Sequence, residues 1–278
     1  MTDVSDSHIL KQQEPSINLK IQSTKMNYLE ILKERLITIP TMASGRKRLI
    51  ILLSQLGDFD SLEYAQALAK QMPQLKDSQI NVLAIGIGNS FGADRFCGFT
   101  GFPRESLIVD SDPSFHRKLG LYAGLEIFGG AWPGLILMCA GFGSPGTLAE
   151  VLRGYKGDHN APQCIEDNET INVPPFPSIS GSLFSRFGVN HQRPFELATV
   201  RLRNMREVLT NWRTYIPTDK YICQRGGTFL LGADDSLLYS YRDQGILGYS
   251  ETMNQPLSFL KPYLIDENIQ TAEENLNQ

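Results

Sequence analysis

The residues best suited to chemistry follow an apolar run that ends at Ser54. Asp58 and Ser61 lie where this run gives way to a helical pattern, and a helix start favours negative charge because its backbone N–H groups are unpaired. A carboxylate at Asp58 is therefore expected to support the helix start or to accept a proton in a pocket. Asp60 and Glu63 have the spacing of a capping box, in which two side chains satisfy N–H groups at the helix start.

Cysteine supplies the second kind of candidate. The four cysteines are far apart and form no Cys-x-x-Cys pair, so the sequence predicts neither a disulfide framework nor a zinc site and fits a reducing compartment. Cys223 is the thiol of most interest, because it shares a loop with Arg225 directly before a predicted strand. Cys97 and Cys139 lie in apolar surroundings and are predicted to be buried in the core.

A glycine-containing loop suggests an enzyme of another class. Gly86, Gly88 and Gly92 follow a predicted strand and open a helix, with Asp110 at the end of the next strand, as in loops whose glycines let the backbone approach a pyrophosphate. The spacing departs from the usual dinucleotide fingerprint. Ser144 lacks the flanking pattern of a hydrolase elbow, and the four histidines lack metal-binding spacing, so neither cofactor nor metal is expected.

The elements that must position these residues alternate between strand and helix. Such an order predicts parallel strand pairing, completed late in the chain by an antiparallel hairpin. The expected strands are 48–54, 80–86, 106–109, 228–231 and 237–241. The expected helices are 26–37, 59–72, 93–99 and 190–215. The second helix is expected to end near Pro73, and residues 124–146 follow no regular pattern.

Three stretches carry a resemblance to a known family. They are the strand, turn and helix over Ser54–Ala69, the sequence from Asp110 through His116 to Leu121, and Gly226-Gly-Thr-Phe-Leu-Leu with Tyr239-x-Tyr-Arg242. They resemble the alkyl hydroperoxide reductase and thiol-specific antioxidant (AhpC/TSA) family in its peroxiredoxin-like branch, over about 46–125 and 220–250. Residues 55–64 are also similar to a subgroup from oxygenic phototrophs. The resemblance implies an α/β protein with a thioredoxin-like fold, whose mixed central sheet is flanked by helices, and a long insertion over 126–215.

The resemblance also implies a site. In that family one or two cysteines stand at this helix start, where the helix dipole stabilises the thiolate that attacks peroxide. Asp58 and Ser61 occupy the two positions here, and neither can form a sulfenic acid. The family has an arginine near Arg225 that stabilises thiolate and peroxide, although Arg225 is one residue out of step with it. We therefore expect a retained pocket of Asp58, Ser61 and Arg225, with Cys223 as a relocated thiol.

Composition narrows the choice of partners and location. A chain of 278 residues with a net charge of −4 suits one elaborated domain over 25–265, between a mobile N-terminus (1–24) and an acidic tail (266–278). The negative charge argues against nucleic acid. No stretch is long enough to span a membrane, so we expect a cytoplasmic protein, with thylakoid or other peripheral membrane association left open. The insertion, or the helix with Arg201, Arg203 and Arg206, is the expected contact for a protein partner or an anionic membrane.

The sequence thus predicts a peroxiredoxin-like protein of the antioxidant, thiol-oxidoreductase class whose peroxidase activity is weak or absent. Such a protein would be a pseudoenzyme, because the position of the family's reactive cysteine holds Asp58. The first alternative is a noncatalytic binding or assembly factor that holds a partner with its insertion. The second is a nucleotide-dependent enzyme that uses Gly86, Gly88 and Gly92.

Overall fold

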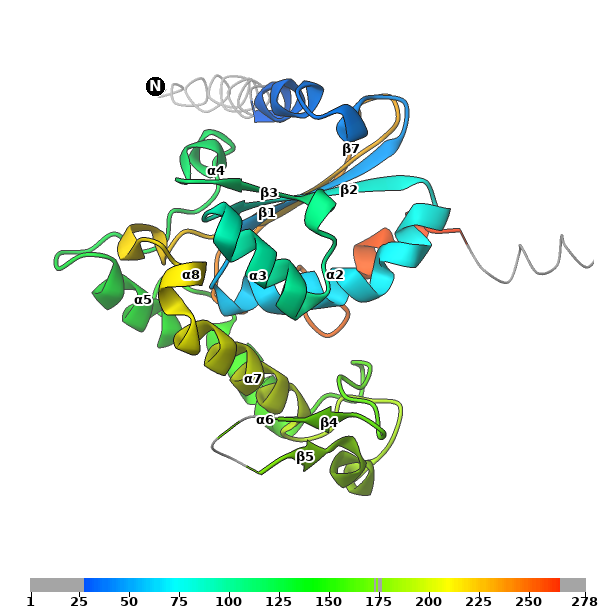
Figure 1. Cartoon of the computed structure of the whole chain (residues 1–278), viewed down its shortest axis with the longest axis vertical. Helices are drawn as coiled ribbons and strands as arrows, with labels where there is room; N and C mark the ends of the chain where they lie inside the picture. Colours follow the sequence, from blue (N-terminus) through cyan, green and yellow to red (C-terminus); the bar gives the residue numbers. More distant parts are fainter. Residues whose placement is uncertain (1–27, 173, 175–176, 266–278) are drawn as a thin grey trace, which may run out of the picture.

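The computed structural model describes residues 28–172, 174 and 177–265. The predicted mobile N-terminus and acidic tail therefore lie outside the described residues. The central feature is a five-stranded sheet in the order β3-β2-β1-β6-β7 (Figure 1). Its strands are β1 (Lys47–Gln55), β2 (Ile80–Ile87), β3 (Leu107–Asp110), β6 (Gly227–Leu231) and β7 (Leu237–Arg242).

The strand pairing confirms the predicted fold. β1 pairs in parallel with β2, and β2 with β3, whereas β1 and β6, and β6 and β7, pair antiparallel. Every predicted strand is present within two residues of its expected bounds. Parallel units followed by an antiparallel hairpin make this a thioredoxin-like fold with a mixed sheet.

Helices cover both faces of the sheet because β1 is apolar on both. Leu49, Ile51 and Leu53 pack in one core with α2 (Phe59–Asp77) and α3 (Ser90–Thr100). Ile50 and Leu52 pack in a second core against residues 28–37, which are helical, and the segment around α4 (Ser114–Lys118). Figure 1 shows these layers on opposite sides of the sheet. The end of β1 is thereby held rigidly at the start of α2.

α2 passes through Pro73 and ends at Asp77, so the expected end near Pro73 is wrong. A proline inside a helix removes a backbone hydrogen bond and crowds the preceding turn. Pro73 is exposed, however, while Leu75 is fully buried. Packing of Leu75 in the core holds the last turn in place.

Residues 126–215 contribute most of the remaining elements. α5 forms within the stretch 124–146 that showed no regular pattern, because Met138 is fully buried in the main core and Ala131 and Leu135 pack against it. The helix expected over 190–215 starts only at Glu196, after Phe195 takes a left-handed conformation, and is interrupted at Asn211. The elements are α5 (Ala131–Cys139), α6 (Thr147–Lys156), β4 (Thr170–Ile171), β5 (Ile179–Ser180), η3 (Gly181–Phe187), α7 (Glu196–Thr210) and α8 (Trp212–Tyr215).

This segment is joined to the core rather than separate from it. Met138, Val208 and Tyr215 belong to the same core as α2 and α3, and only Ile165, Ile171 and Phe184 form a small core apart. Short 3-10 turns complete the chain: η1 (Pro40–Met42), η2 (Arg104–Ser106), η4 (Asp219–Tyr221) and η5 (Ser258–Tyr263). In the described part of the chain, no helix combines the length and apolarity needed to cross a membrane.

Candidate functional site

The turn between β1 and α2 places Asp58 at the N-terminal end of α2. Asp58 is the N-cap residue, but its side chain makes no capping hydrogen bond and is only 12% exposed. A Cβ atom on Gly57 would lie 2.6 Å from Ile216, so only glycine fits where the segment after α8 crosses the turn. Gln55 Nε2 donates to the carbonyl of Thr218 in the same segment. The turn is thus covered by the end of the insertion.

Arg225 enters this turn from the loop before β6. Its Nη1 lies 2.8 Å from Asp58 Oδ2 and 3.3 Å from Asp60 Oδ2, and its side chain is 1% exposed. Its Nε and Nη2 donate to the carbonyls of Cys223 and Ile222. The guanidinium is therefore fixed in place by carboxylates and carbonyls of the chain itself.

Three carboxyl groups share this one cation. Burial raises the pKa of Asp60 well above its usual range, and the charge of Asp58 raises it further. Burial also raises the pKa of Asp243, to about 8. Burial alone would lower the pKa of Arg225, but Asp58 and Asp60 raise it overall. At neutral pH the cluster therefore keeps Arg225 charged and holds at least one proton on a carboxyl group.

The predicted capping box is wrong, because both of its side chains have distant partners. Asp60 Oδ2 accepts from the backbone N–H of Leu247 at 2.7 Å, in addition to its contact with Arg225. Glu63 accepts from Arg201 Nε at 2.7 Å and from the hydroxyl of Tyr249 at 3.1 Å. Asp243 is the member of the cluster that sequence patterns missed, since it follows β7 and only folding brings it near Arg225.

Ser61 and Cys223 lie close in sequence to the pair but do not join it. Ser61 is buried on α2 and takes no part in the ion pairs or hydrogen bonds of Arg225. Cys223 is buried, and its Sγ donates to the carbonyl of Ala131 at 3.2 Å. Burial raises the pKa of this thiol, Arg225 lowers it and Asp58 raises it, with a net increase. Cys223 is therefore held as a neutral thiol packed beneath α5.

Cys139 corrects a second prediction, since it is exposed on α5 and not part of the core. Burial of its sulfur raises its pKa, and the next contributions come from Asp58, which raises it, and Arg225, which lowers it. The Cys139 thiol is thus within electrostatic reach of the Asp58–Arg225 pair. The apolar run 135–138 concealed this, because helical periodicity turns residue 139 outward from the buried Met138. Cys97 is buried, as predicted.

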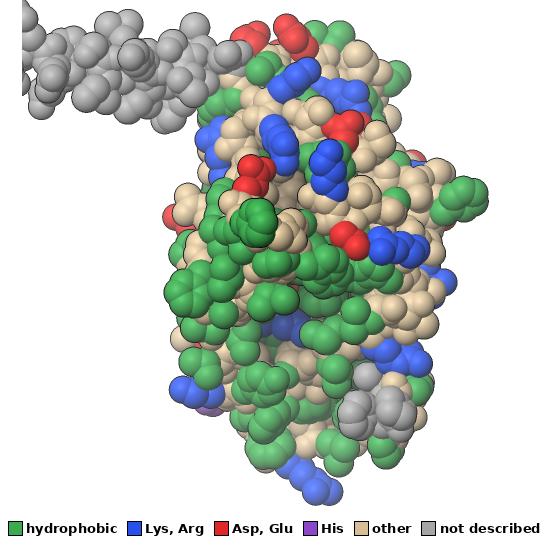
Figure 2. All heavy atoms as spheres, turned by 90° about the vertical axis from the view of Figure 1, so that its left-hand side faces the viewer, with side chains coloured by type: hydrophobic (Ala, Val, Ile, Leu, Met, Phe, Trp, Pro, Cys, Tyr) green, Lys and Arg blue, Asp and Glu red, His purple; other side chains and the backbone are tan. Residues whose placement is uncertain are grey.

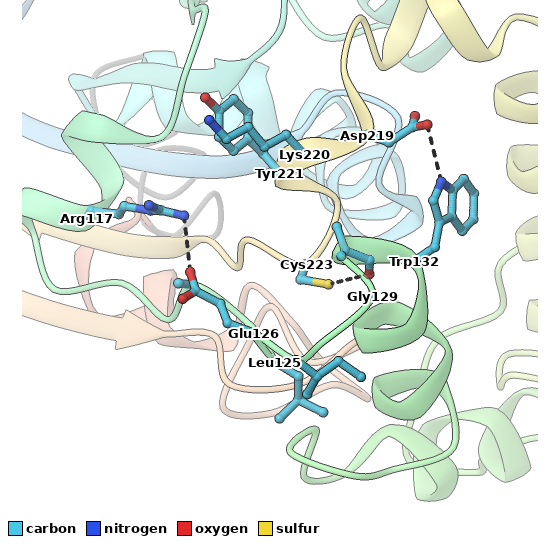
Figure 3. Close-up of a pocket in the computed structure, with 13 residues that line it drawn as sticks. Arg117, Leu125, Glu126, Gly129, Trp132, Asp219, Lys220, Tyr221 and Cys223 are labelled. Atoms are coloured by element: carbon cyan, nitrogen blue, oxygen red, sulfur yellow. Dashed lines mark hydrogen bonds and ion pairs between the residues drawn. The ribbon is translucent and has the colours of Figure 1, made fainter.

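A cavity of about 460 Å³ opens beside Cys223 and not at Asp58 (Figure 3). In Figure 3, Arg117 and Glu126 lie on one side of Cys223, with Trp132 and Asp219 on the other. Arg117 Nη2 is 3.6 Å from Glu126 Oε1, and Trp132 Nε1 donates to Asp219 Oδ2 at 3.2 Å. The polar groups of this cavity are thus largely paired with one another. No group of His, Cys, Asp or Glu in the described residues could hold a metal ion.

The glycine loop does not leave room for a pyrophosphate. The side chain of Leu56 fills the space beside Gly86 and Gly88, and the carbonyl of Thr214 lies 2.6 Å from a Cβ built on Gly92. Asn89 caps α3 by accepting from the Gly92 N–H at 2.8 Å. The glycines therefore permit close packing, which gives them a role that needs no dinucleotide.

The arginines of α7 are used mainly inside the chain. Arg201 contacts Glu63 and also Glu150 Oε2 at 3.2 Å, Arg203 contacts Glu169 at 3.4 Å, and Arg206 Nε donates to the carbonyl of Pro174. Only Arg206 is exposed. The helix thus offers a smaller cationic surface than its sequence indicates.

Comparison with known proteins adds one match. A family model described as AhpC/TSA antioxidant enzyme matches residues 67–245, which is more than half of the chain. The matched region includes Cys223, Arg225 and Asp243 and begins after the turn that carries Asp58. Neither a curated protein nor a solved structure matches the chain.

Proposed function

The chain belongs to the AhpC/TSA antioxidant enzyme family, and from this premise we propose that it is a peroxiredoxin-like member with weak or absent peroxidase activity. One observation carries the proposal: Asp58 occupies the start of α2 and contacts Arg225 at 2.8 Å, where the family reaction requires a thiolate. The fold is kept, and the reacting atom is replaced by a carboxylate.

The chemistry of the replacement supports this conclusion. A thiolate reduces a peroxide by attacking one oxygen, so that the O–O bond breaks, sulfur becomes a sulfenic acid and the other oxygen leaves as alcohol or water. A carboxylate cannot accept oxygen in this way. Asp58 and Asp60 also occupy the Arg225 guanidinium, which is then not free to bind a peroxide.

Limited access to the turn also supports weak or absent peroxidase activity. Ile216 and Tyr215 press against Gly57, and the side chain of Asp58 is nearly buried. The nearest thiols do not compensate, since the pKa values of both Cys223 and Cys139 are raised and thiols react with peroxide as thiolates.

Peroxide consumption with a thioredoxin-regenerating system tests the proposal. We expect the wild-type chain to turn over no faster than a variant with all four cysteines changed to serine. Cys223→Ser and Cys139→Ser are measured beside it. Turnover by the wild type that is lost in either single variant would establish a relocated thiol and overturn the proposal.

Asp58→Cys tests the same site by gain of function. A thiol there would stand at a helix start next to Arg225, and both features stabilise a thiolate. We expect sulfenic acid at position 58 after one equivalent of peroxide, detected by dimedone labelling and mass spectrometry. Asp58→Ser is the matched control without sulfur. Absence of labelling in a folded Asp58→Cys variant would show that more than the sulfur is missing.

A further inference from the structure

α5, α6 and their connecting loops present an apolar face to solvent. We define this apolar face by six side chains: Phe128, Trp132, Ile136, Phe142, Leu148 and Leu152. Phe128 is fully exposed, and the other five are 44–65% exposed. Figure 2 shows hydrophobic side chains gathered over the middle and lower part of this side of the molecule. A continuous apolar surface of this kind marks a contact with a partner or a membrane.

α6 is oriented opposite to an ordinary surface helix. Leu148, Val151, Leu152 and Tyr155 have the i, i+3, i+4, i+7 spacing of a core-facing stripe, yet each is at least 36% exposed. Two of its three charged side chains point inward instead. Glu150 and Arg153 are about 13–14% exposed and pair with each other, and Glu150 also contacts Arg201. Because buried ion pairs hold its polar side, the outward apolar stripe is a fixed feature of the fold.

The shape of the apolar face suits a lipid interface. Phe128 precedes Gly129 and Gly130, and Phe142 lies between Gly141 and Gly143, so both rings project from sharp loops built on left-handed glycines. An amphipathic helix lying flat with apolar side chains outward is the common form of an interfacial membrane helix. Trp132 combines an exposed ring with a hydrogen bond to Asp219, as aromatic residues at membrane interfaces do.

Charge at the rim selects the kind of lipid. Lys156 at the end of α6 lies one turn after Leu152, is exposed, and forms no ion pair within the described residues. In Figure 2, Lys and Arg side chains lie at the edges of the hydrophobic area, and most acidic side chains lie above it. A second copy of the chain would bring the same cations to this rim, whereas anionic headgroups neutralise them.

We propose that the apolar face docks on an anionic lipid bilayer, with Phe128, Phe142, Leu148 and Leu152 entering the interface and Lys156, with the other cations at the edges of the face, meeting the headgroup phosphates. The inference does not depend on whether the Asp58 turn is catalytically silent. It gives the insertion a binding role that the sheet and its turn do not supply.

Vesicle flotation with the full chain tests this docking. We expect binding to vesicles that contain phosphatidylglycerol, weaker binding to phosphatidylcholine alone, and a loss of binding at high salt. Leu152→Glu should weaken binding by about tenfold or more. Ile37→Glu is the matched control, because Ile37 is 80% exposed on the helix that covers the other face of the sheet. Circular dichroism checks that both variants fold.

Tryptophan fluorescence gives a second readout. The chain has two tryptophans, so Trp212→Phe leaves Trp132 as the only reporter. We expect its emission to shift to the blue with anionic vesicles and to be quenched by brominated lipid. Failure to float with either vesicle type would overturn the proposal. So would a dimer in light scattering that Leu152→Glu converts to a monomer, since the face would then belong to a second copy.

Discussion

The β1–α2 turn and the apolar face of α5 and α6 differ in which of their side chains are accessible to other molecules. At the turn, Asp58, Asp60 and Arg225 are buried against one another, and the covering segment after α8 leaves little of them accessible. On α6 Glu150 and Arg153 are also turned inward, but the apolar stripe is left in solvent. The turn is thus closed by contacts within the chain, whereas the insertion leaves apolar side chains in solvent.

One ion network connects the two regions. Arg201 on α7 lies between Glu63 on α2 and Glu150 on α6. Its Nε is 2.7 Å from Glu63 Oε2, and its Nη2 is 3.2 Å from Glu150 Oε2. All three side chains are 11–13% exposed. The helix that begins at Asp58 therefore also anchors α6 with its apolar stripe outward. Variants that change residues in only one of the two regions therefore measure how far the stability and binding of each region depend on the other.

The largest effect is expected at Arg225. Arg225→Met keeps the side-chain volume but leaves Asp58, Asp60 and Asp243 without their cation, and removing one partner of a buried ion pair costs about 3–5 kcal/mol. Urea denaturation should show that loss in the free energy of unfolding. Arg206→Met, at an exposed arginine, should stay within about 0.5 kcal/mol. Equal stability of the two variants would mean that the turn is not held by its charges.

A matched pair of leucines separates core from docking surface. Leu68 on α2 is fully buried, so Leu68→Ala should lower the free energy of unfolding by about 2–5 kcal/mol. Leu152 on α6 is 53% exposed, so Leu152→Ala should change it by less than about 0.5 kcal/mol while weakening vesicle binding. Urea denaturation measures both. A large loss for Leu152→Ala would show that its side chain is covered in solution.

His116 should make the sheet sensitive to acid. It is fully buried, its Nε2 lies 2.7 Å from the carbonyl of Leu53, and burial lowers its pKa to about 4. The unfolded chain binds a proton below about pH 6.5 and the folded chain only near pH 4, so stability falls as the pH drops through this window. The expected loss between pH 7 and pH 5 is about 2 kcal/mol.

The control for His116 is a variant that does not titrate. His116→Gln keeps an N–H donor for the carbonyl of Leu53, so unfolding measured at both pH values should lose most of this dependence. Asp243 acts in the opposite direction, since its raised pKa favours the folded chain in acid, but wild type and variant share this effect. An unchanged acid dependence in the variant would exclude His116 as its source.

These contrasts also show what the sequence could and could not predict. β1 was predictable because an apolar run buried on both faces needs only local information, and Asp58 was placed correctly at its end. Asp60 and Glu63 were not, because a capping box is local while their partners Leu247 and Arg201 are more than a hundred residues away. The distant partners, and not the local capping pattern, therefore determine where these two side chains point.

α6 makes the same point at the surface. Its stripe, with Leu148 and Leu152, has the spacing of a helix that faces a core, whereas distant partners such as Arg201 hold its polar side inward and leave the stripe in solvent. Cys139 was misplaced for a related reason. Hydrophobicity of a run indicates burial on average, whereas the rotation of α5 around Met138 determines which of its residues is exposed.

The smallest expected effect tests whether the charge of Asp58 in the closed turn influences the exposed thiol of Cys139. In Asp58→Asn the ion pair with Arg225 is lost, but Asp60 Oδ2 still accepts from Arg225 Nη1, so the free energy of unfolding should change by less than about 1 kcal/mol. The lost charge should lower the pKa of Cys139, which Asp58 raises, and so speed its alkylation by less than about tenfold. Cys97 responds to Arg104, Asp94 and Glu105 instead and serves as the internal control when peptide mass spectrometry follows both thiols. An unchanged rate at Cys139 would confine the influence of Asp58 to the buried cluster and separate the two regions electrostatically.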